Sequence, residues 1–483
     1  MKIFVLAIFC VFSYLSQAFP HSGKPRYHLI IDTDGAIDDM RAITMLLSAN
    51  DIRVLAITCS EGSLKSDGVF VKVRSLLSTL HHEGIRLGIS ENTHFITPVW
   101  ASFAQSVSWG REMNNSGNIP MSNSTDLLDQ VTVNYNDKIT LIALGSLKTY
   151  ADWIQSNPSA INKIERIIWY NDHNIREGFN YQVSPPGYDF IRGSGIKLEI
   201  VSAATNNLKV NQSYLDELQR CNSPYARQII KVHQQKAVAE KIEKDSLYLW
   251  DDMVPLYLAV PFLFDVETAD HIKYVTPLRD IPENIITEII TRLLESSNQT
   301  DNKVFTAFPV DSGFYKPGYA RIVNSTIENY GLTEWKAIAL TNEIHGHTGI
   351  YSIIGAKMGI RAMEYFNVGI NNLNVTTFAG NTPPLSCLND GVQISTGSTI
   401  GQGLIIISDS ISNIPSAEFE FNHQKVMISL KEPIAVQMQN EIRDGVKKYG
   451  LLTDQYWLYI EDLALKYWAE FDRHEIFTIK TIK

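Results

Sequence analysis

Short apolar runs alternate with helix-like stretches through the first two thirds of the chain. Residues 29–31 form a run typical of a buried central strand, and residues 41–47 follow with apolar positions at helical spacing. The same alternation predicts further strands at 53–58, 138–144, 166–169 and 197–201, and a helix at 69–80. Strands that alternate with helices favour a mostly parallel sheet with helices on both faces. The pattern therefore predicts an α/β domain over residues 19–331.

The pattern changes after a loop-rich stretch at 303–330, which we expect to close the first domain. Beyond it, the spacing predicts helices at 334–341 and 353–366, strands within 416–430, and two helices within 437–471. Gly355 and Gly359 stand four residues apart in one predicted helix, which indicates close packing on a neighbouring helix. We therefore expect a smaller α+β domain over residues 332–483.

The first 18 residues have the form of a secretory signal peptide. Lys2 precedes an apolar run at 3–15, and the small-residue ending Ser16-Gln17-Ala18 is typical of a cleavage site. The run is too short for a comfortable membrane span, although a retained anchor is the alternative, and no later stretch is long and apolar enough for one. We therefore expect a secreted or periplasmic protein.

Charge and cysteine content exclude two classes of protein. The formal net charge of −10 becomes −10 − 1 = −11 once the peptide with Lys2 is removed, so the overall field does not attract nucleic acid. Of four cysteines, Cys10 lies in the expected signal peptide, which leaves Cys59, Cys221 and Cys387. Three cysteines cannot all pair within one chain. Stability must therefore come from hydrophobic cores rather than from a disulfide scaffold.

Four aspartates follow the first predicted strand within eight residues: Asp32, Asp34, Asp38 and Asp39. Carboxylates this close repel one another unless a cation lies among them, and their hard oxygen atoms favour Ca²⁺ or Mg²⁺. Open α/β sheets place their chemistry at the carboxyl ends of strands. The pattern therefore predicts a metal site. A solvated acidic turn that caps the next helix is the alternative, although capping needs only one aspartate.

The Asp-x-Asp-x-x-x-Asp-Asp spacing at 32–39 resembles the signature of the calcium-dependent nucleoside hydrolases. Further landmarks at 140–147, 178–185 and 250–253 agree in order, so that the similarity covers about residues 27–325. The resemblance implies hydrolysis of the N-glycosidic bond of a nucleoside or related ribosyl compound. It also implies a small-molecule substrate, and we expect a homo-oligomer.

Residue roles follow from the resemblance position by position. It implies that Ca²⁺ is held by Asp34, Asp39, Asp252 and the backbone carbonyl of Leu144. Asp38 and Asn180 would hold the ribose hydroxyls, and Asp32 would support the cluster from behind. Asp34 would take the proton of the attacking water, consistent with an oxocarbenium-like reaction at C1′.

Three positions depart from the family pattern. Gly178 stands where a ribose-supporting glutamate is usual, although Glu177 is adjacent, and Ser63 replaces an asparagine. Asp251 stands where some members carry a histidine that protonates the leaving base. A carboxyl group can donate that proton only if burial or a neighbour raises its pKa. Asp251 is thus the expected acid.

Two other interpretations of the first domain remain. A haloacid-dehalogenase-like phosphatase also has Asp-x-Asp-Gly after a strand, but that loop gives no reason for Asp38 and Asp39. A binding protein could keep metal and pentose recognition without turnover. An enzyme needs an acid near Asp251 or a base that leaves unassisted, whereas a binding protein needs neither.

The second predicted domain contains its own group of potential metal ligands. His345 and His347 flank one glycine, and Cys387 and Asp390 follow about forty residues later. These residue types could bind a transition metal such as zinc. The alternative is one hydrogen-bonded histidine, one surface histidine and a cysteine in the core.

His-Gly-His, Cys-x-x-Asp and the glycine-rich segment 396–403 together resemble the E-subunit family of formylmethanofuran dehydrogenase over about residues 332–440. That resemblance implies metal binding by His345, His347, Cys387 and Asp390. Ser398 and Gln402 depart from it, since a cysteine and a lysine are usual there.

Overall fold

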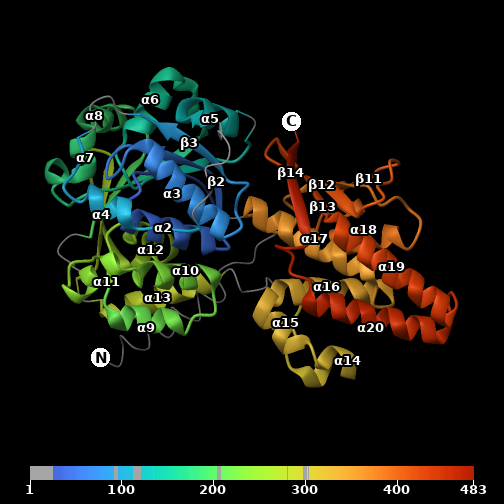
Figure 1. The fold of residues 1–483 in the computed structure, drawn as a ribbon. Helices are drawn as coiled ribbons and strands as arrows, with labels where there is room; N and C mark the ends of the chain where they lie inside the picture. Colours follow the sequence, from blue (N-terminus) through green and yellow to red (C-terminus); the bar gives the residue numbers. More distant parts are fainter. Residues whose placement is uncertain are drawn as a thin grey trace.

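The computed structural model describes residues 26–91, 96–111, 121–133, 135–203, 208–279, 281–296, 302 and 304–482. The predicted signal peptide at 1–18 lies outside these residues. The described chain forms one large and one small sheet, each in a separate domain, and the two domains lie side by side (Figure 1).

The large sheet has the strand order β4-β3-β2-β1-β5-β6-β7-β9-β8. Neighbouring strands pair in parallel, except that β8 and β9 pair antiparallel. The strands are β1 (Tyr27–Thr33), β2 (Ile52–Ser60), β3 (Arg86–Ser90), β4 (Ser122–Asn123), β5 (Ile139–Ala143), β6 (Ile164–Tyr170), β7 (Leu198–Val201), β8 (Phe264–Ala269) and β9 (Ile272–Pro277). The predicted mostly parallel sheet is confirmed.

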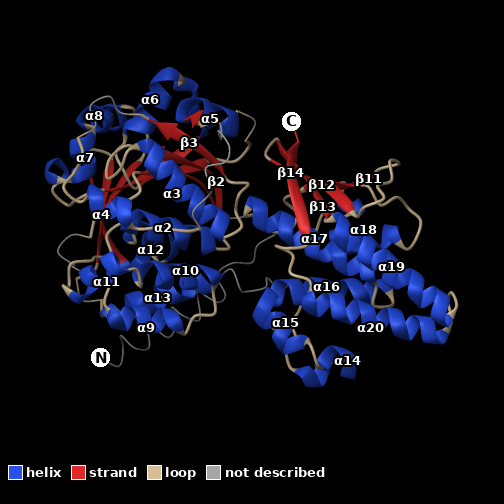
Figure 2. Cartoon of the chain, in the orientation of Figure 1, coloured by secondary structure: helices blue, strands red, loops and turns tan. Residues whose placement is uncertain are grey.

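Helices cover both faces of this sheet, as Figure 2 shows. One apolar core contains residues of α2 (Ile37–Ser48), α3 (Ser66–Thr79), α9 (Gln212–Gln219), α10 (Pro224–His233), α12 (Met253–Ala259) and α13 (Glu283–Glu295). A second core contains residues of α5 (Ser124–Thr132), α6 (Lys148–Ser156) and α8 (Pro185–Gly193). Because both faces are covered, β2 and β5 are buried at every position.

The second domain contains the sheet β11-β10-β12-β13-β14, in which only β10 and β11 pair in parallel. Its strands are β10 (Asn374–Thr377), β11 (Ile405–Ile407), β12 (Ser416–Phe421), β13 (Gln424–Leu430) and β14 (Phe477–Ile482). Its helices include α16 (Leu332–His345), α17 (Ile350–Phe366), α18 (Leu388–Thr396), α19 (Glu432–Tyr449) and α20 (Asp454–Glu470). This is the expected smaller α+β domain.

The segment before residue 331 packs differently from our expectation. Instead of closing the first domain, Phe308 and Val323 are buried in the core of the second. α15 (Val323–Tyr330) packs on α16 and α20, and α14 (Pro317–Ala320) packs on α20. The apolar positions of α15 need a partner surface, and α16 and α20 supply it. The core of the second domain therefore includes residues that precede 331 in the chain.

α17 packs closely on α18, and the glycines explain how. A Cβ atom on Gly355 would lie 2.2 Å from the carbonyl oxygen of Leu388, and one on Gly359 would lie 2.0 Å from Ser395 Oγ. Because Gly355 and Gly359 have no side chain, α18 can approach the backbone of α17 closely at both positions. This confirms the close helix packing that the glycine spacing predicts.

The three cysteines within the described residues do not cross-link the fold. Cys59 and Cys221 are buried free thiols, and Cys387 is a half-buried free thiol. Among the described residues, no helix combines the length and apolar character needed to cross a membrane.

Candidate active site

The acidic loop begins where β1 ends, in the middle of the large sheet. β1 lies between β2 and β5, and Asp32, Asp34 and Asp39 are almost fully buried. Asp38 and Asp39 occupy the first turn of α2, where the helix dipole favours negative charge. The residue that caps α2 is Ala36, and its side chain makes no capping bond. The aspartates are therefore not explained by helix capping.

Hydrogen bonds fix two of these carboxylates. Asp39 Oδ1 accepts from Thr33 Oγ1 at 2.6 Å and from the Asp34 backbone N–H at 3.1 Å. Asp32 accepts from Thr58 Oγ1 at 2.6 Å and from Ser60 Oγ at 2.7 Å, both on β2. Asp32 therefore ties the loop to the neighbouring strand.

Asp38, Asp39 and Asp251 form a buried cluster in which a ligand oxygen of each lies within 4.8 Å of the others. Burial, and then the charge of Asp39, raises the pKa of Asp38 to about 7. Burial, followed by the charges of Asp39 and Asp38, also raises the pKa of Asp251. Asp251 Oδ1 is buried and has no hydrogen-bond partner. Carboxylates in this state favour a bound proton or a hard divalent cation.

Asp34 belongs to the same electrostatic group. Burial, and then the charge of Asp39, raises the pKa of its carboxyl, while hydrogen bonds from Ser63 oppose that rise. Ser63 Oγ in turn accepts from Trp100 Nε1 at 3.1 Å. The proposed base is thus linked through one serine to a partly exposed aromatic residue.

Asp252, a predicted calcium ligand, lies elsewhere. Its Oδ1 accepts from Arg41 Nε at 3.0 Å and its Oδ2 from Arg41 Nη2 at 2.8 Å, with both side chains fully buried. Adjacent residues at the start of α12 point in different directions, so Asp251 faces the cluster and Asp252 faces α2. The geometry thus places Asp251, and not Asp252, among the carboxylates of the cluster, and Asp252 is bound by Arg41. The predicted roles of Asp252 as a calcium ligand and of Asp251 as an acid stay predictions.

Leu144 and Asn180 come together as neighbours of the site. Asn180 Nδ2 donates to the Leu144 carbonyl at 2.7 Å and to the Tyr170 carbonyl at 3.0 Å. The Leu144 N–H donates to the Asp32 carbonyl at 2.9 Å. Asn180 on α7 (Phe179–Val183) therefore joins the carboxyl ends of β5 and β6.

The predicted ribose-binding residue Glu177 and its neighbour Gly178 have different surroundings. Glu177 is exposed at the end of a 3₁₀ turn, η2 (Ile175–Glu177). A Cβ on Gly178 would lie 2.3 Å from Asn171 Oδ1, so the Asn171 amide occupies the space beside it. Asn171 follows β6, is buried, and accepts from the Tyr181 backbone N–H at 3.2 Å. Sequence reasoning missed Asn171, whose only signal is a polar residue directly after a strand.

In the second domain, His345 Nδ1 contacts Asp390 Oδ2 at 2.8 Å, and the ring centroids of His345 and His347 are 4.3 Å apart. Burial, and then the charge of Asp390, raises the pKa of the half-buried Cys387 thiol. Among the described residues, the predicted ligands here do not form a group of three close enough to share an ion.

Ser398, one of the two positions that depart from the second resemblance, makes a structural contact. Its Oγ donates to the Leu373 carbonyl at 2.7 Å.

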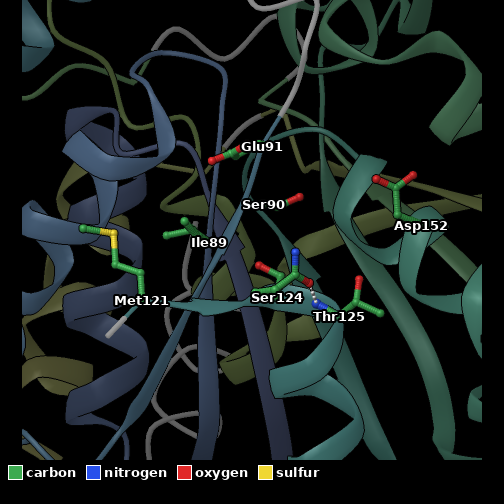
Figure 3. A pocket seen from close by; sticks show the side chains of 8 residues that line it. Ile89, Ser90, Glu91, Met121, Ser124, Thr125 and Asp152 are labelled. Atoms are coloured by element: carbon green, nitrogen blue, oxygen red, sulfur yellow. Dashed lines mark hydrogen bonds between the residues drawn. The ribbon is translucent and has the colours of Figure 1, made fainter. Parts of the chain in front are cut away.

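A separate surface pocket of about 300 Å³ lies at the end of β3 and the start of α5 (Figure 3). Glu91, Ser124 and Asp152 contribute to its lining. No residue of the acidic cluster lines this pocket, so it does not belong to the candidate site.

Comparison with known proteins decides the family. Residues 29–314 match the profile of the family described as inosine-uridine preferring nucleoside hydrolase. The chain belongs to this family. Residues 344–461 match a second profile, described as FmdE, molybdenum formylmethanofuran dehydrogenase operon. The chain thus joins a nucleoside hydrolase domain to an FmdE-like domain, as the two resemblances predict.

Similar individual proteins are distant. Uridine nucleosidase 1 of Arabidopsis thaliana is 23% identical over 220 residues, which is 42% of this chain and 64% of that protein. The plant nucleoside hydrolase PpNRh1 has a TM-score of 0.46 and 19% identity, covering 56% of this chain and 100% of the other. The inosine-uridine preferring nucleoside hydrolase from Bacillus anthracis has a TM-score of 0.45 and 15% identity, covering 56% and 99%.

Two partly exposed tryptophans neighbour residues of the site, one in space and one along the chain. Trp100 is 40% exposed, and its ring meets that of Phe179 edge-on at 4.7 Å. Trp250, directly before Asp251, is 45% exposed and stacks on Tyr248 at 5.3 Å. These four aromatics were absent from the predicted site. Spacing along the chain does not show which aromatic residues lie near the carboxylates in the folded protein, so the sequence alone gives these four no role.

Proposed function

We propose that this protein hydrolyses the N-glycosidic bond of a nucleoside or related ribosyl compound with the help of calcium. The observation that carries the proposal is the buried cluster of Asp38, Asp39 and Asp251 beside Asp34, at the carboxyl end of the central strand. A cluster of this kind fits a hard cation, and the family to which the chain belongs gives the reaction class.

Asp34, Asp39, Asp251 and the Leu144 carbonyl would hold the ion. When bound, calcium supplies a positive charge that lowers the pKa of a coordinated water. Asp34 would accept the proton of the attacking water, while Asp38 and Asn180 hold the ribose hydroxyls. The water oxygen then bonds to C1′ as the bond from C1′ to the base nitrogen breaks, through an oxocarbenium-like state.

The leaving base would lie on the aromatic side of the site. Trp100 is linked to Asp34 through Ser63, which brings its partly exposed indole to the cluster, and Trp250 directly precedes Asp251 in the chain and is also partly exposed. Aromatic rings stack on planar bases and are tolerant of base identity. With Asp251 in the carboxylate cluster, the proton for the base would come from solvent.

Export directed by residues 1–18, and assembly into a homo-oligomer, are further parts of the proposal.

The test is release of reducing sugar from a panel of purine and pyrimidine nucleosides by the purified chain, with calcium and with a chelator. We expect chelator-sensitive release that Asp34→Ala abolishes. Asp189→Ala, which removes an exposed aspartate on α8, is the matched control and should retain activity. No release from any nucleoside by protein that binds calcium would reject this substrate class in favour of a binding role.

A further inference from the structure

Lys72 is a buried lysine beside the acidic loop that the proposed reaction does not use. It lies on α3 and is only 8% exposed. Its Nζ donates to the Gly35 carbonyl at 3.4 Å and also to the Ala104 carbonyl. Gly35 lies within the acidic loop, and Ala104 lies in α4 (Ala101–Ser106). One ammonium group thus joins three separate segments of the chain.

Lys72 also faces the carboxylates of the site. Burial lowers its pKa to about 8, and the charges of Asp39 and Asp34 oppose that decrease. The ammonium is therefore mostly protonated at neutral pH. The other buried cation beside the loop, Arg41, has its guanidinium bound by Asp252. The charge of Arg41 acts on Asp38, whereas the charge of Lys72 acts on Asp34 and Asp39.

We propose that Lys72 is a positioning residue that holds α4 against the acidic loop and lowers the affinity of the carboxylate cluster for calcium. This inference rests on the proposed function. A fixed positive charge near the carboxylates repels a divalent cation, so it keeps the affinity below that of the carboxylates alone. The same ammonium satisfies backbone carbonyls of the two segments that it joins.

The contact with Ala104 connects Lys72 to the rim of the site. Trp100 directly precedes α4, donates to Ser63 and packs on Phe179. Release of Ala104 would therefore loosen the segment that carries the Trp100 indole. We expect a loss of substrate affinity from this change, since the chemistry at Asp34 is not altered.

The experiment compares Lys72→Met and Lys72→Arg with Lys65→Met in the full chain. Lys65 is an exposed lysine at the start of the same helix and serves as the matched control. Calcium binding is measured by isothermal titration calorimetry, and kcat and KM are measured with the best nucleoside of the panel. We expect Lys72→Met to bind calcium about tenfold more tightly than wild type. Its KM should rise more than its kcat falls.

Lys72→Arg keeps the charge and should restore the wild-type calcium affinity, while Lys65→Met should change neither quantity. A purely structural role predicts the opposite sign, with weaker calcium binding in Lys72→Met, and that result would overturn the inference. Unchanged calcium affinity in Lys72→Met would overturn it as well. Lys72→Gln provides a second neutral variant if the methionine variant does not fold.

The two proposals fail in distinguishable ways. If the wild-type chain binds calcium but hydrolyses no nucleoside, the hydrolase proposal fails, and the calcium titrations of the Lys72 variants still decide the charge effect. If the wild-type chain binds no calcium, both proposals are rejected.

Discussion

Two adjacent aspartates at the start of α12 have opposite surroundings. Asp251 shares a buried cluster with two other carboxylates, and one of its oxygens has no partner. Asp252 forms a bidentate pair with Arg41. The surroundings of Asp251 favour binding of a cation. Those of Asp252 already contain one, the Arg41 guanidinium, which neutralises its buried charge.

This contrast gives opposite predictions for two conservative variants. Asp251→Asn should abolish calcium binding but leave the metal-free protein at least as stable as wild type, because burial and the charges of Asp39 and Asp38 disfavour the charged form of the carboxyl that it removes. Asp252→Asn should destabilise the protein by about 3–5 kcal/mol, because it leaves the Arg41 guanidinium buried without a carboxylate. Chemical denaturation in chelator and calorimetric titration with calcium measure the two effects.

Each variant of this pair controls for the other. If Asp252→Asn lost calcium binding with its stability unchanged, while Asp251→Asn unfolded, the assignment of the two residues would be reversed.

The same pair shows what the sequence could predict at the residue scale. The spacing of Asp32, Asp34, Asp38 and Asp39 was enough to predict a carboxylate group after the first strand. It could not say which of two adjacent aspartates, more than two hundred residues away, faces that group. Such a choice depends on the position of Arg41 on α2. Asn171 was missed for a similar reason, since its place beside Gly178 exists only once the loop after β6 has folded.

At the scale of elements, apolar periodicity predicted the central strands and failed at the edge of the sheet. β1, β2, β5, β6 and β7 were predicted close to their observed bounds because they are buried on both faces. β8 is exposed at nearly every position, so no apolar run or strict alternation marks it. β3 is short and contains a glycine. The first helices of the second domain were mistaken for a closing segment of the first, because periodicity does not say which domain an amphipathic helix packs on.

Close packing of α17 on α18 leads to a prediction at this scale. Gly355→Ala places a methyl group where only 2.2 Å separates it from the Leu388 carbonyl, so the helices must move apart. We expect a loss of about 1–3 kcal/mol, although alanine is the better helix former. Thermal unfolding followed by circular dichroism measures it.

Gly193→Ala on α8 is the control, because a Cβ there meets nothing within 4 Å. It should leave stability unchanged or raise it by up to about 1 kcal/mol. Equal stability of Gly355→Ala and Gly193→Ala would mean that the α17 and α18 contact is looser than the structure shows.

At the scale of the whole molecule, a compact joint connects the two domains. Arg361 on α17 donates to the His81 carbonyl at 3.0 Å and pairs with Glu83 at 3.0 Å. The Gly84 N–H donates to the Tyr365 carbonyl at 2.8 Å. Residues 81–84 of the first domain therefore rest on the end of α17.

Two stacked imidazoles complete this joint. The rings of His81 and His474 have centroids 3.6 Å apart and lie nearly parallel. Burial opposes protonation of His474, but the charge of Glu364 and a hydrogen bond to Asp472 raise its pKa. Burial, and then the charge of His474, lowers the pKa of His81 to about 4. The joint therefore favours a proton on His474 over a proton on His81.

The joint makes the stability of the molecule depend on pH in a definite direction. Folded His81 does not bind the proton that the unfolded chain binds below about pH 6.5. The contribution of His81 to the free energy of unfolding is therefore complete above pH 6.5 and is lost as the pH falls toward 4.

The wild-type chain should lose about 1–2 kcal/mol more of its free energy of unfolding than His81→Gln between pH 7 and pH 4.5, after allowance for the partial exposure of His81. Calorimetric unfolding in saturating calcium measures this difference, with His173→Gln, an exposed histidine, as the control. If His81→Gln and wild type lost the same stability, the two rings would not be titrating against each other, and the other contacts between the domains, such as those of Arg361 and Arg53, would account for the joint.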